Sequence, residues 1–182
     1  MNLPNILTCI RFALIGVFVY LFLVPQNYIS AMFVFAIATL TDILDGYIAR
    51  KYNKITNFGK LMDPLADKLM LIAALCCFVY AKRLPPVILL FVVLKELLMI
   101  LGGIVLYKKN VVVYAFKVGK VAATFFNCGV VLTFFANYIS PMHLIFFAIA
   151  IFCAIIAFIQ YMRSFWHNRK ELSKKMGDRK KL

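Results

Sequence analysis

The chain has 182 residues, of which 64% are hydrophobic and 15% charged, with a formal net charge of +14. A soluble domain is usually about 45–50% apolar, so this composition excludes an ordinary soluble protein and indicates one embedded in a membrane. The excess of Lys and Arg lies largely in loops and in the tail of this apolar chain, which suits anionic lipid headgroups, and no nucleic-acid partner is expected.

Six apolar segments follow one another along the chain, each bounded by polar, charged or proline-containing residues. Each is close to the roughly 20 residues that a helix needs to cross the hydrocarbon core. Backbone polar groups inside a bilayer must be satisfied within the segment, so each is expected to be helical. The sequence predicts an all-α integral membrane fold, a six-transmembrane-helix bundle in a single domain over 1–182. The expected spans are 6–24, 29–49, 60–81, 86–107, 116–138 and 142–164.

The charges of the loops predict how the helices are oriented. Loops 50–59 and 108–120 and the tail at about 165–182 are rich in Lys and Arg, whereas loops 25–28 and 139–141 carry no charge. With six spans, the basic loops and tail fall on the same side as the N-terminus, and the positive-inside bias makes that side cytoplasmic. We therefore expect a multi-pass protein of the cell membrane with both termini in the cytosol.

Four of the seven acidic residues lie in or beside the second and third of these helices. Asp42 and Asp45 are three residues apart, and Asp63 and Asp67 are four apart, so each pair shares one helix face. An antiparallel hairpin brings both pairs together near the cytoplasmic side. Ionisable groups at membrane depth are costly, which makes all four candidates for a functional site.

Four carboxylates at close quarters form an oxygen-rich, strongly negative pocket. They repel one another unless a cation neutralises them, and hard divalent ions such as Mg²⁺ or Mn²⁺ prefer oxygen ligands. Two such ions about 4 Å apart suit an in-line displacement at phosphorus. The alternative is an intramembrane network in which the aspartates pair with nearby cations, namely Arg50, Lys60 and Lys68.

Two glycines and two cations adjoin these carboxylates. Gly46 and Gly59 lack a side chain, so a bulky ligand can approach the backbone closely there, although packing or a turn would also explain them. Arg50 and Lys68 can meet phosphate charge from a substrate. Their alternative role is to anchor the helices at the membrane interface.

Together these residues spell a pattern of eight fixed identities over 26 positions: Asp42-x2-Asp45-Gly46-x2-Ala49-Arg50-x8-Gly59-x3-Asp63-x3-Asp67. The pattern resembles the motif of the CDP-alcohol phosphatidyltransferases. This resemblance implies six transmembrane helices, commonly in a homodimer, with a site that opens to the cytosolic membrane surface. It also implies that Asp42, Asp45 and Asp63 are metal ligands, and that Asp67 is both a further ligand and the general base.

The resemblance implies a reaction as well. An alcohol attacks the lipid-bearing phosphorus of a CDP-linked lipid and CMP is released, while a base accepts the hydroxyl proton and metal ions stabilise the departing phosphate. Gly46 and Gly59 are then expected to border the cytidine nucleotide. Arg50 is expected near the substrate's phosphates or lipid-side charge.

Two N-terminal stretches, residues 2–8 with Arg11 and residues 56–68, resemble the phosphatidylglycerophosphate synthase branch of the family. The expected reaction is therefore transfer of a phosphatidyl group from CDP-diacylglycerol to glycerol 3-phosphate. Lys95-Glu96 stands where that branch often has Arg-Glu, and residues 119–124 lack the second lysine of its usual Gly-Lys-x-Lys-Thr stretch. These departures leave a cardiolipin synthase, with phosphatidylglycerol as acceptor, as the alternative.

Glycerol 3-phosphate is a dianion and needs cations to bind it. The candidate residues for its phosphate are Lys60, Lys95, Lys117 and Lys120. Lys95 has an alternative role as the ion-pair partner of Glu96. From another class of protein, a divalent-cation transporter would place its carboxylates near the bilayer midplane, often in repeated halves. Here the acids cluster toward one face and no repeat is visible.

Overall fold

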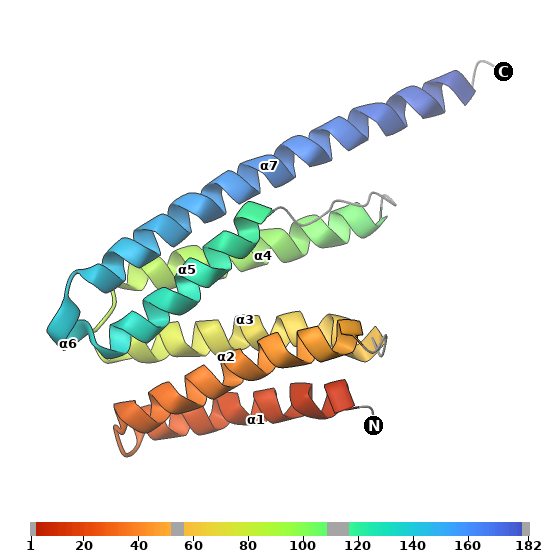
Figure 1. Cartoon of the computed structure of the whole chain (residues 1–182). Coiled ribbons are helices and arrows are strands. Elements are labelled where there is room, and N and C mark those ends of the chain that lie inside the picture. Colours follow the sequence, from red (N-terminus) through yellow and green to blue (C-terminus); the bar gives the residue numbers. More distant parts are fainter. Residues whose placement is uncertain (1–2, 52–56, 109–116, 180–182) are drawn as a thin grey trace. The chain divides into compact units, whose positions relative to one another are not determined.

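The computed structural model describes the backbone of residues 3–51, 57–108 and 117–179, and the side chains of 9–41, 62, 65–102 and 118–164. Within these residues all regular secondary structure is helical, as predicted (Figure 1). The helices are α1 (Leu3–Leu23), α2 (Tyr28–Lys51), α3 (Asn57–Tyr80), α4 (Pro86–Lys108), α5 (Lys117–Phe134), α6 (Ala136–Ile139) and α7 (Met142–Arg179).

Six helices coincide with the six predicted segments, and two boundaries differ. The fifth predicted segment is divided at Phe135, whose φ of −99° and ψ of 14° end α5 and precede the short α6. The last helix continues through the basic tail to Arg179, instead of ending at residue 164. Residues 165–179 contain no proline, and eight of the fifteen are Lys, Arg, Leu, Met or Glu, which favour helix.

Membrane-length apolar character is clearest in α7. Among the described residues, Met142–Ser164 is the one helical stretch long and apolar enough to cross a membrane, and three other apolar helices are shorter: Cys9–Leu23, Tyr28–Thr41 and Val118–Phe134. Six transmembrane spans therefore remain an inference from the apolar segments of the sequence.

The helices group into two compact units, which we describe separately. The first contains Met1–Leu89 and Val130–Ser140, and the second contains Leu90–Gly129 and Pro141–Leu182. The predicted single functional domain stays a prediction.

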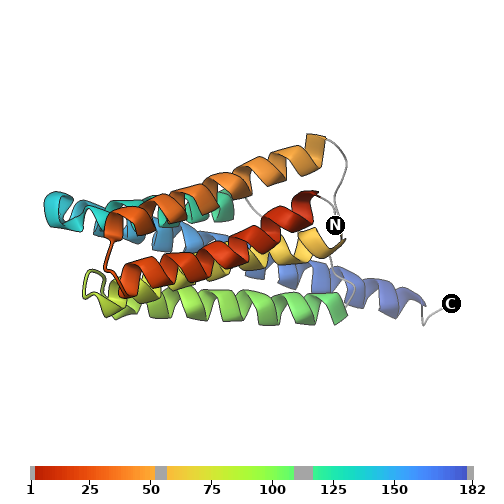
Figure 2. The same cartoon turned by 90° about the horizontal axis from the view of Figure 1, so that it is seen from below.

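In the first unit, α1 packs against both α2 and α3. Phe22 of α1 is buried at the centre of an aromatic cluster, with its ring centroid 5.0 Å from that of Tyr28 and 5.3 Å from that of Phe78. Phe18, one turn earlier, lies 6.2 Å from Phe35 of α2. These contacts hold together the end of α1, the start of α2 and the end of α3. The start of α1, the end of α2 and the start of α3 lie at the opposite end of the unit (Figures 1 and 2).

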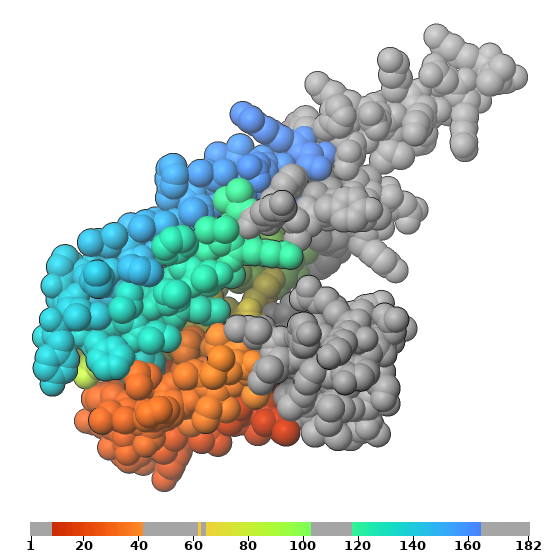
Figure 3. Space-filling view, in the orientation of Figure 1, coloured from red at the N-terminus to blue at the C-terminus, as the bar shows by residue number. Residues whose placement is uncertain are grey.

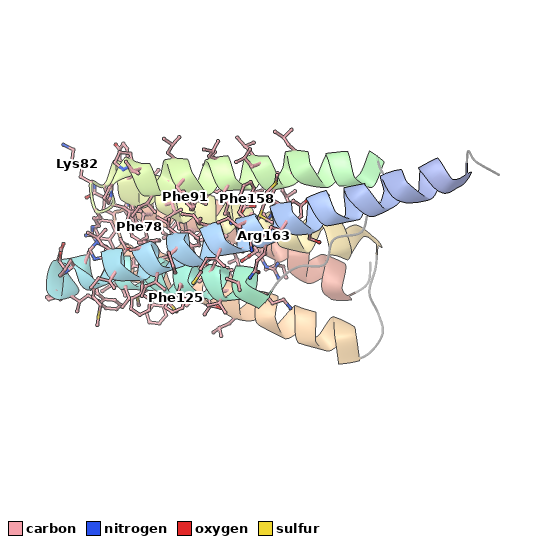
Figure 4. The ribbon with its side chains drawn as sticks, turned by 90° about the horizontal axis from the view of Figure 1, so that it is seen from above. Phe78, Lys82, Phe91, Phe125, Phe158 and Arg163 are labelled. Carbon is pink, nitrogen blue, oxygen red and sulfur yellow. The ribbon has the colours of Figure 1, made fainter. Side chains whose placement is uncertain are left out.

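Two turns close the aromatic end of this unit. Asn27 caps α2, because its Oδ1 accepts a hydrogen bond of 3.1 Å from the Ser30 N–H. At the end of α3, Arg83 places its guanidinium 4.1 Å from the ring centroid of Tyr28 and donates a 3.5 Å hydrogen bond to the Phe134 carbonyl. Figure 4 shows Phe78 among the side chains of the unit and Lys82 pointing away from the helices. Arg83 thus ties the turn after α3 to α2 and to the end of α5.

In the second unit, ring contacts join α5 to α7. Phe126 and Phe147 lie 6.2 Å apart between ring centroids, and Phe125 and Phe146 lie 5.6 Å apart. Side chains of the two helices adjoin over several turns (Figure 3). A Cβ at Gly129 would lie 3.1 Å from two carbons of the buried Phe147 ring, so the missing side chain lets the ring pack on the helix backbone.

Gly129→Ala is therefore expected to destabilise the protein by about 1–3 kcal/mol, because the added methyl must displace the fully buried ring of Phe147. The free energy of unfolding in a detergent titration checks this. Gly16→Ala is the matched control, since a Cβ there meets nothing within 4 Å. It should leave stability unchanged or raise it by up to about 1 kcal/mol, because alanine favours helix over glycine. Equal effects of the two substitutions would contradict the packing described here.

Candidate active site

The four aspartates lie on two consecutive helices of the first unit. Asp42 and Asp45 belong to the second half of α2, and Asp63 and Asp67 belong to the first half of α3. Since α2 ends at Lys51 and α3 begins at Asn57, the segments that carry the acids share one end of the unit (Figures 1 and 2). This is the end opposite the aromatic cluster.

The ring contacts of α1 with α2 and α3 serve as reference points for the positions of the acids along these helices. Asp42 follows Phe35 by seven residues, or about 10 Å along α2. Asp67 precedes Phe78 by eleven residues, or about 16 Å along α3. The partners of these two rings, Phe18 and Phe22, are themselves separated by about 6 Å along α1. The helical rise therefore puts Asp42 and Asp67 at the same level.

Asp45 and Asp63 are each about one turn farther toward the shared end of α2 and α3. The backbone thus arranges the acids in two levels, with one residue from each helix at each level. Of the four side chains, that of Asp67 is described, and it is half-buried. Those of Asp42, Asp45 and Asp63 lie outside the described side chains, so the four-carboxylate centre stays a prediction.

The donor set suits a hard divalent cation, because carboxylate oxygens from two adjacent helices are the ligands that Mg²⁺ and Mn²⁺ prefer. Among the described side chains, no three His, Cys, Asp or Glu residues are grouped closely enough to hold a metal. Gly46 and Arg50 lie in α2, and Gly59 and Lys60 lie in α3, at the same end as the acids. Their side-chain surroundings are outside the described part, and their predicted roles in binding substrate stay predictions.

The other three candidate lysines belong to the second unit. Lys95 Nζ lies 2.5 Å from Glu96 Oε1 and 5.8 Å from the ring centroid of Phe126. Glu96 is buried and Lys95 half-buried, so the ion pair offered as the alternative role of Lys95 is present. Lys120 is exposed on α5, and the side chain of Lys117 lies outside the described ones. A role for any of them in binding the acceptor stays a prediction.

Comparison with known proteins decides the family. The family model that describes the CDP-alcohol phosphatidyltransferases matches residues 1–162 of this chain. The chain belongs to this family. The family is membrane-bound and uses divalent metal ions, which agrees with the apolar helices and the carboxylate donors. The resemblance drawn from the sequence motif is therefore confirmed.

Three relatives share the name CDP-diacylglycerol--glycerol-3-phosphate 3-phosphatidyltransferase. That of Pseudomonas fluorescens is 49% identical over 81 residues, which are 43% of this chain and 42% of the relative. That of Aquifex aeolicus is 28% identical over 88% of this chain and 94% of the relative. That of Bacillus subtilis is 37% identical over 66% of this chain and 69% of the relative.

One residue that motif reasoning left without a role stands out in this family member. Arg11 lies within the apolar α1 and is 1% exposed. A lone cation inside an apolar span is the signal that points to it in the sequence. It is among the largest fully buried side chains, and the charge it carries needs an opposite charge nearby.

Proposed function

We propose that this protein transfers a phosphatidyl group from CDP-diacylglycerol to glycerol 3-phosphate, giving phosphatidylglycerophosphate and CMP. The observation that carries the proposal is the set of four aspartates, two each on α2 and α3, within the complete family motif. The acceptor is supported by the relatives named for this reaction, two of which are matched over 94% and 69% of their own length.

The reaction forms a bond from the acceptor hydroxyl oxygen to the lipid-bearing phosphorus and breaks the bond from that phosphorus to CMP. Asp67 accepts the proton of the hydroxyl as the oxygen attacks. Asp42, Asp45, Asp63 and Asp67 would hold two Mg²⁺ or Mn²⁺ ions, which supply positive charge to the phosphoryl oxygens and to the departing phosphate. Gly46 and Gly59 leave room for the cytidine nucleotide beside the helix backbones, and Arg50 offers charge to the phosphates.

The depth of the acids supports a site in one half of the membrane, toward the end that α2 and α3 share. Tyr80 and Tyr138, at the aromatic end of the first unit, are 78% and 89% exposed, as expected of residues at a membrane interface. Asp67 precedes Tyr80 by thirteen residues, or about 20 Å along α3. The hydrocarbon core is about 30 Å thick, so Asp67 lies beyond its midplane, in the half nearer the other face, and Asp63 lies about one turn closer to that face.

Six spans formed by α1–α5 and α7 put both termini and this face in the cytosol of a cell-membrane protein. Cysteine labels in loop 50–59 and after residue 165 should then react only from the cytosolic side. Labelling from the opposite side would invert the orientation. A homodimer, as the family resemblance implies, should appear as twice the chain mass in lipid nanodiscs, and a single mass would exclude it.

The Lys95–Glu96 pair is the observation that favours an acceptor other than glycerol 3-phosphate. Glu96 compensates the charge of one of the lysines proposed to bind the acceptor phosphate. A cardiolipin synthase, or another family member with a different acceptor, would share every motif aspartate. Family membership leaves the divalent-cation transporter without support.

The test gives purified protein CDP-diacylglycerol with Mg²⁺ or Mn²⁺ and one acceptor at a time. Glycerol 3-phosphate, phosphatidylglycerol, serine and inositol are compared by the release of CMP. Of these four acceptors, only glycerol 3-phosphate is expected to give release of CMP. Release with phosphatidylglycerol but not with glycerol 3-phosphate would replace the proposed function by the cardiolipin synthase.

A further inference from the structure

Arg11 is a charged group buried inside an otherwise apolar helix. It follows Leu3, the start of α1, by about 12 Å and precedes Leu23, the end of α1, by about 18 Å. At 1% exposure its guanidinium is removed from water and from the lipid surface. A charge buried in this way is stable only beside an opposite charge or a strong set of acceptors.

The sequence of the first unit offers few opposite charges. Its only acidic residues are Asp42, Asp45, Asp63 and Asp67, the four aspartates of the candidate active site. Any carboxylate partner that Arg11 has within its own unit is therefore one of these four. The register of the helices indicates which.

The contact between α1 and α2 relates the position of Arg11 to that of Asp42. Phe18 and Phe35 face each other across these helices, with ring centroids 6.2 Å apart. Arg11 precedes Phe18 by seven residues and Asp42 follows Phe35 by seven. Because the helices are antiparallel, both steps lead in the same direction. Seven residues are about two turns, so Arg11 and Asp42 share the level, and the faces, of that contact.

The contact between α1 and α3 relates the position of Arg11 to that of Asp67. Phe22 and Phe78 face each other with ring centroids 5.3 Å apart. Arg11 precedes Phe22 by eleven residues, and Asp67 precedes Phe78 by eleven. These helices run in parallel (Figure 2). Eleven residues are about three turns, so the helical repeat puts Arg11 and Asp67 again at one level and on the faces of that contact. Two independent ring contacts thus place one cation level with one aspartate of each helix.

We infer that Arg11 is the counter-cation of Asp42 and Asp67, the two aspartates at the level farther from the shared end of α2 and α3, with its guanidinium between them. It is a positioning residue, because it acts on the substrate only through these carboxylates. The planar guanidinium can donate to two carboxylates at once and hold them in fixed orientations. In the metal-free protein it offsets part of their repulsion, so α1 is fastened to the site before divalent ions bind. The inference rests on the proposed metal centre.

The test compares melting temperatures of full-length protein in detergent with EDTA and with saturating Mn²⁺. In Arg11→Gln the carboxylates lose their resident cation, so the stabilisation gained from Mn²⁺ should be at least about twice that of the wild type. Arg11→Lys retains the charge and should stay close to the wild-type gain. If Arg11→Gln fails to fold, the folding of Arg11→Lys and Arg11→Met is compared instead. Arg11→Met lacks the charge and should also fail to fold, whereas Arg11→Lys keeps the charge and should fold.

Arg83→Gln is the matched control, since Arg83 is a partly buried arginine of the same unit that contacts Tyr28 and the Phe134 carbonyl at the aromatic end. It should lower the melting temperature equally with EDTA and with Mn²⁺. The same pattern in Arg11→Gln would reduce Arg11 to a packing residue and overturn the inference.

A double-mutant cycle separates this inference from the proposed function. If Arg11 balances Asp67, adding Asp67→Asn to Arg11→Gln should restore part of the melting temperature lost in EDTA, because both members of the pair are then uncharged. This readout needs neither metal nor activity. Additive losses would overturn the role of Arg11 even if Mn²⁺ binds the wild type. Restoration without any Mn²⁺ binding would support the pair and contradict the metal centre instead.

Discussion

Single replacement of Asp42, Asp45, Asp63 or Asp67 by Asn is expected to lower kcat by about 10²–10⁴-fold, the usual range for loss of a positioned proton acceptor, with a comparable loss expected for a metal ligand. Asn has almost the shape of Asp, so the variants should remain folded. The rate of CMP release from CDP-diacylglycerol, measured with intrinsic fluorescence to confirm folding, tests this expectation.

Two controls accompany these variants. Glu171→Gln makes the same change from carboxylate to amide in the basic extension of α7, outside the motif sequence, and should retain wild-type turnover. EDTA should abolish turnover of the wild type, and added Mg²⁺ or Mn²⁺ should restore it. Turnover near the wild-type rate in any two of the four Asn variants would rule out a shared carboxylate centre.

Neutralising a lysine that binds the acceptor phosphate should weaken acceptor binding and little else. A charge-assisted contact contributes about 1.5–3 kcal/mol, so Lys→Gln at a true ligand should raise KM for glycerol 3-phosphate by roughly ten-fold to a hundred-fold. KM for CDP-diacylglycerol should change much less. The four positions to test by steady-state kinetics are Lys60, Lys95, Lys117 and Lys120.

Lys95 requires a separate comparison because it already pairs with Glu96. If Lys95 serves only that pair, Lys95→Gln lowers thermal stability and leaves the acceptor KM unchanged. The double variant Lys95→Gln with Glu96→Gln should then recover stability, since no charge is left buried alone. Unchanged acceptor KM in all four single variants would remove the lysines from the acceptor site.

Much of the fold follows from local properties of the sequence. Apolar length and the need to satisfy backbone groups in a bilayer predict the helices, and their ends fall within a few residues of expectation. The division at Phe135 and the extension of α7 to Arg179 were not predicted. Hydropathy marks where a segment leaves the membrane, whereas the helix itself ends only where backbone geometry changes, and residues 165–179 contain no proline to end it.

The candidate site divides in the same way. The four aspartates could be found from sequence because acidic residues are rare and costly in apolar helices. The choice between two roles for Lys95 could not be made, because spacing along one helix does not tell which partner its side chain reaches. Arg11 received no role for a related reason. Its level relative to Asp42 and Asp67 depends on which aromatic residues meet between helices, and the structure supplies those contacts.

Mn²⁺ binding followed by electron paramagnetic resonance tests most directly whether aspartates from α2 and α3 form one two-metal centre. Such a centre should bind two Mn²⁺ ions per chain in a spin-coupled pair, as expected for ions about 4 Å apart. Asp42→Asn and Asp67→Asn, one on each helix, should each abolish the coupling. A wild-type protein that binds a single uncoupled Mn²⁺, or variants that keep the coupled pair, would contradict the two-metal centre.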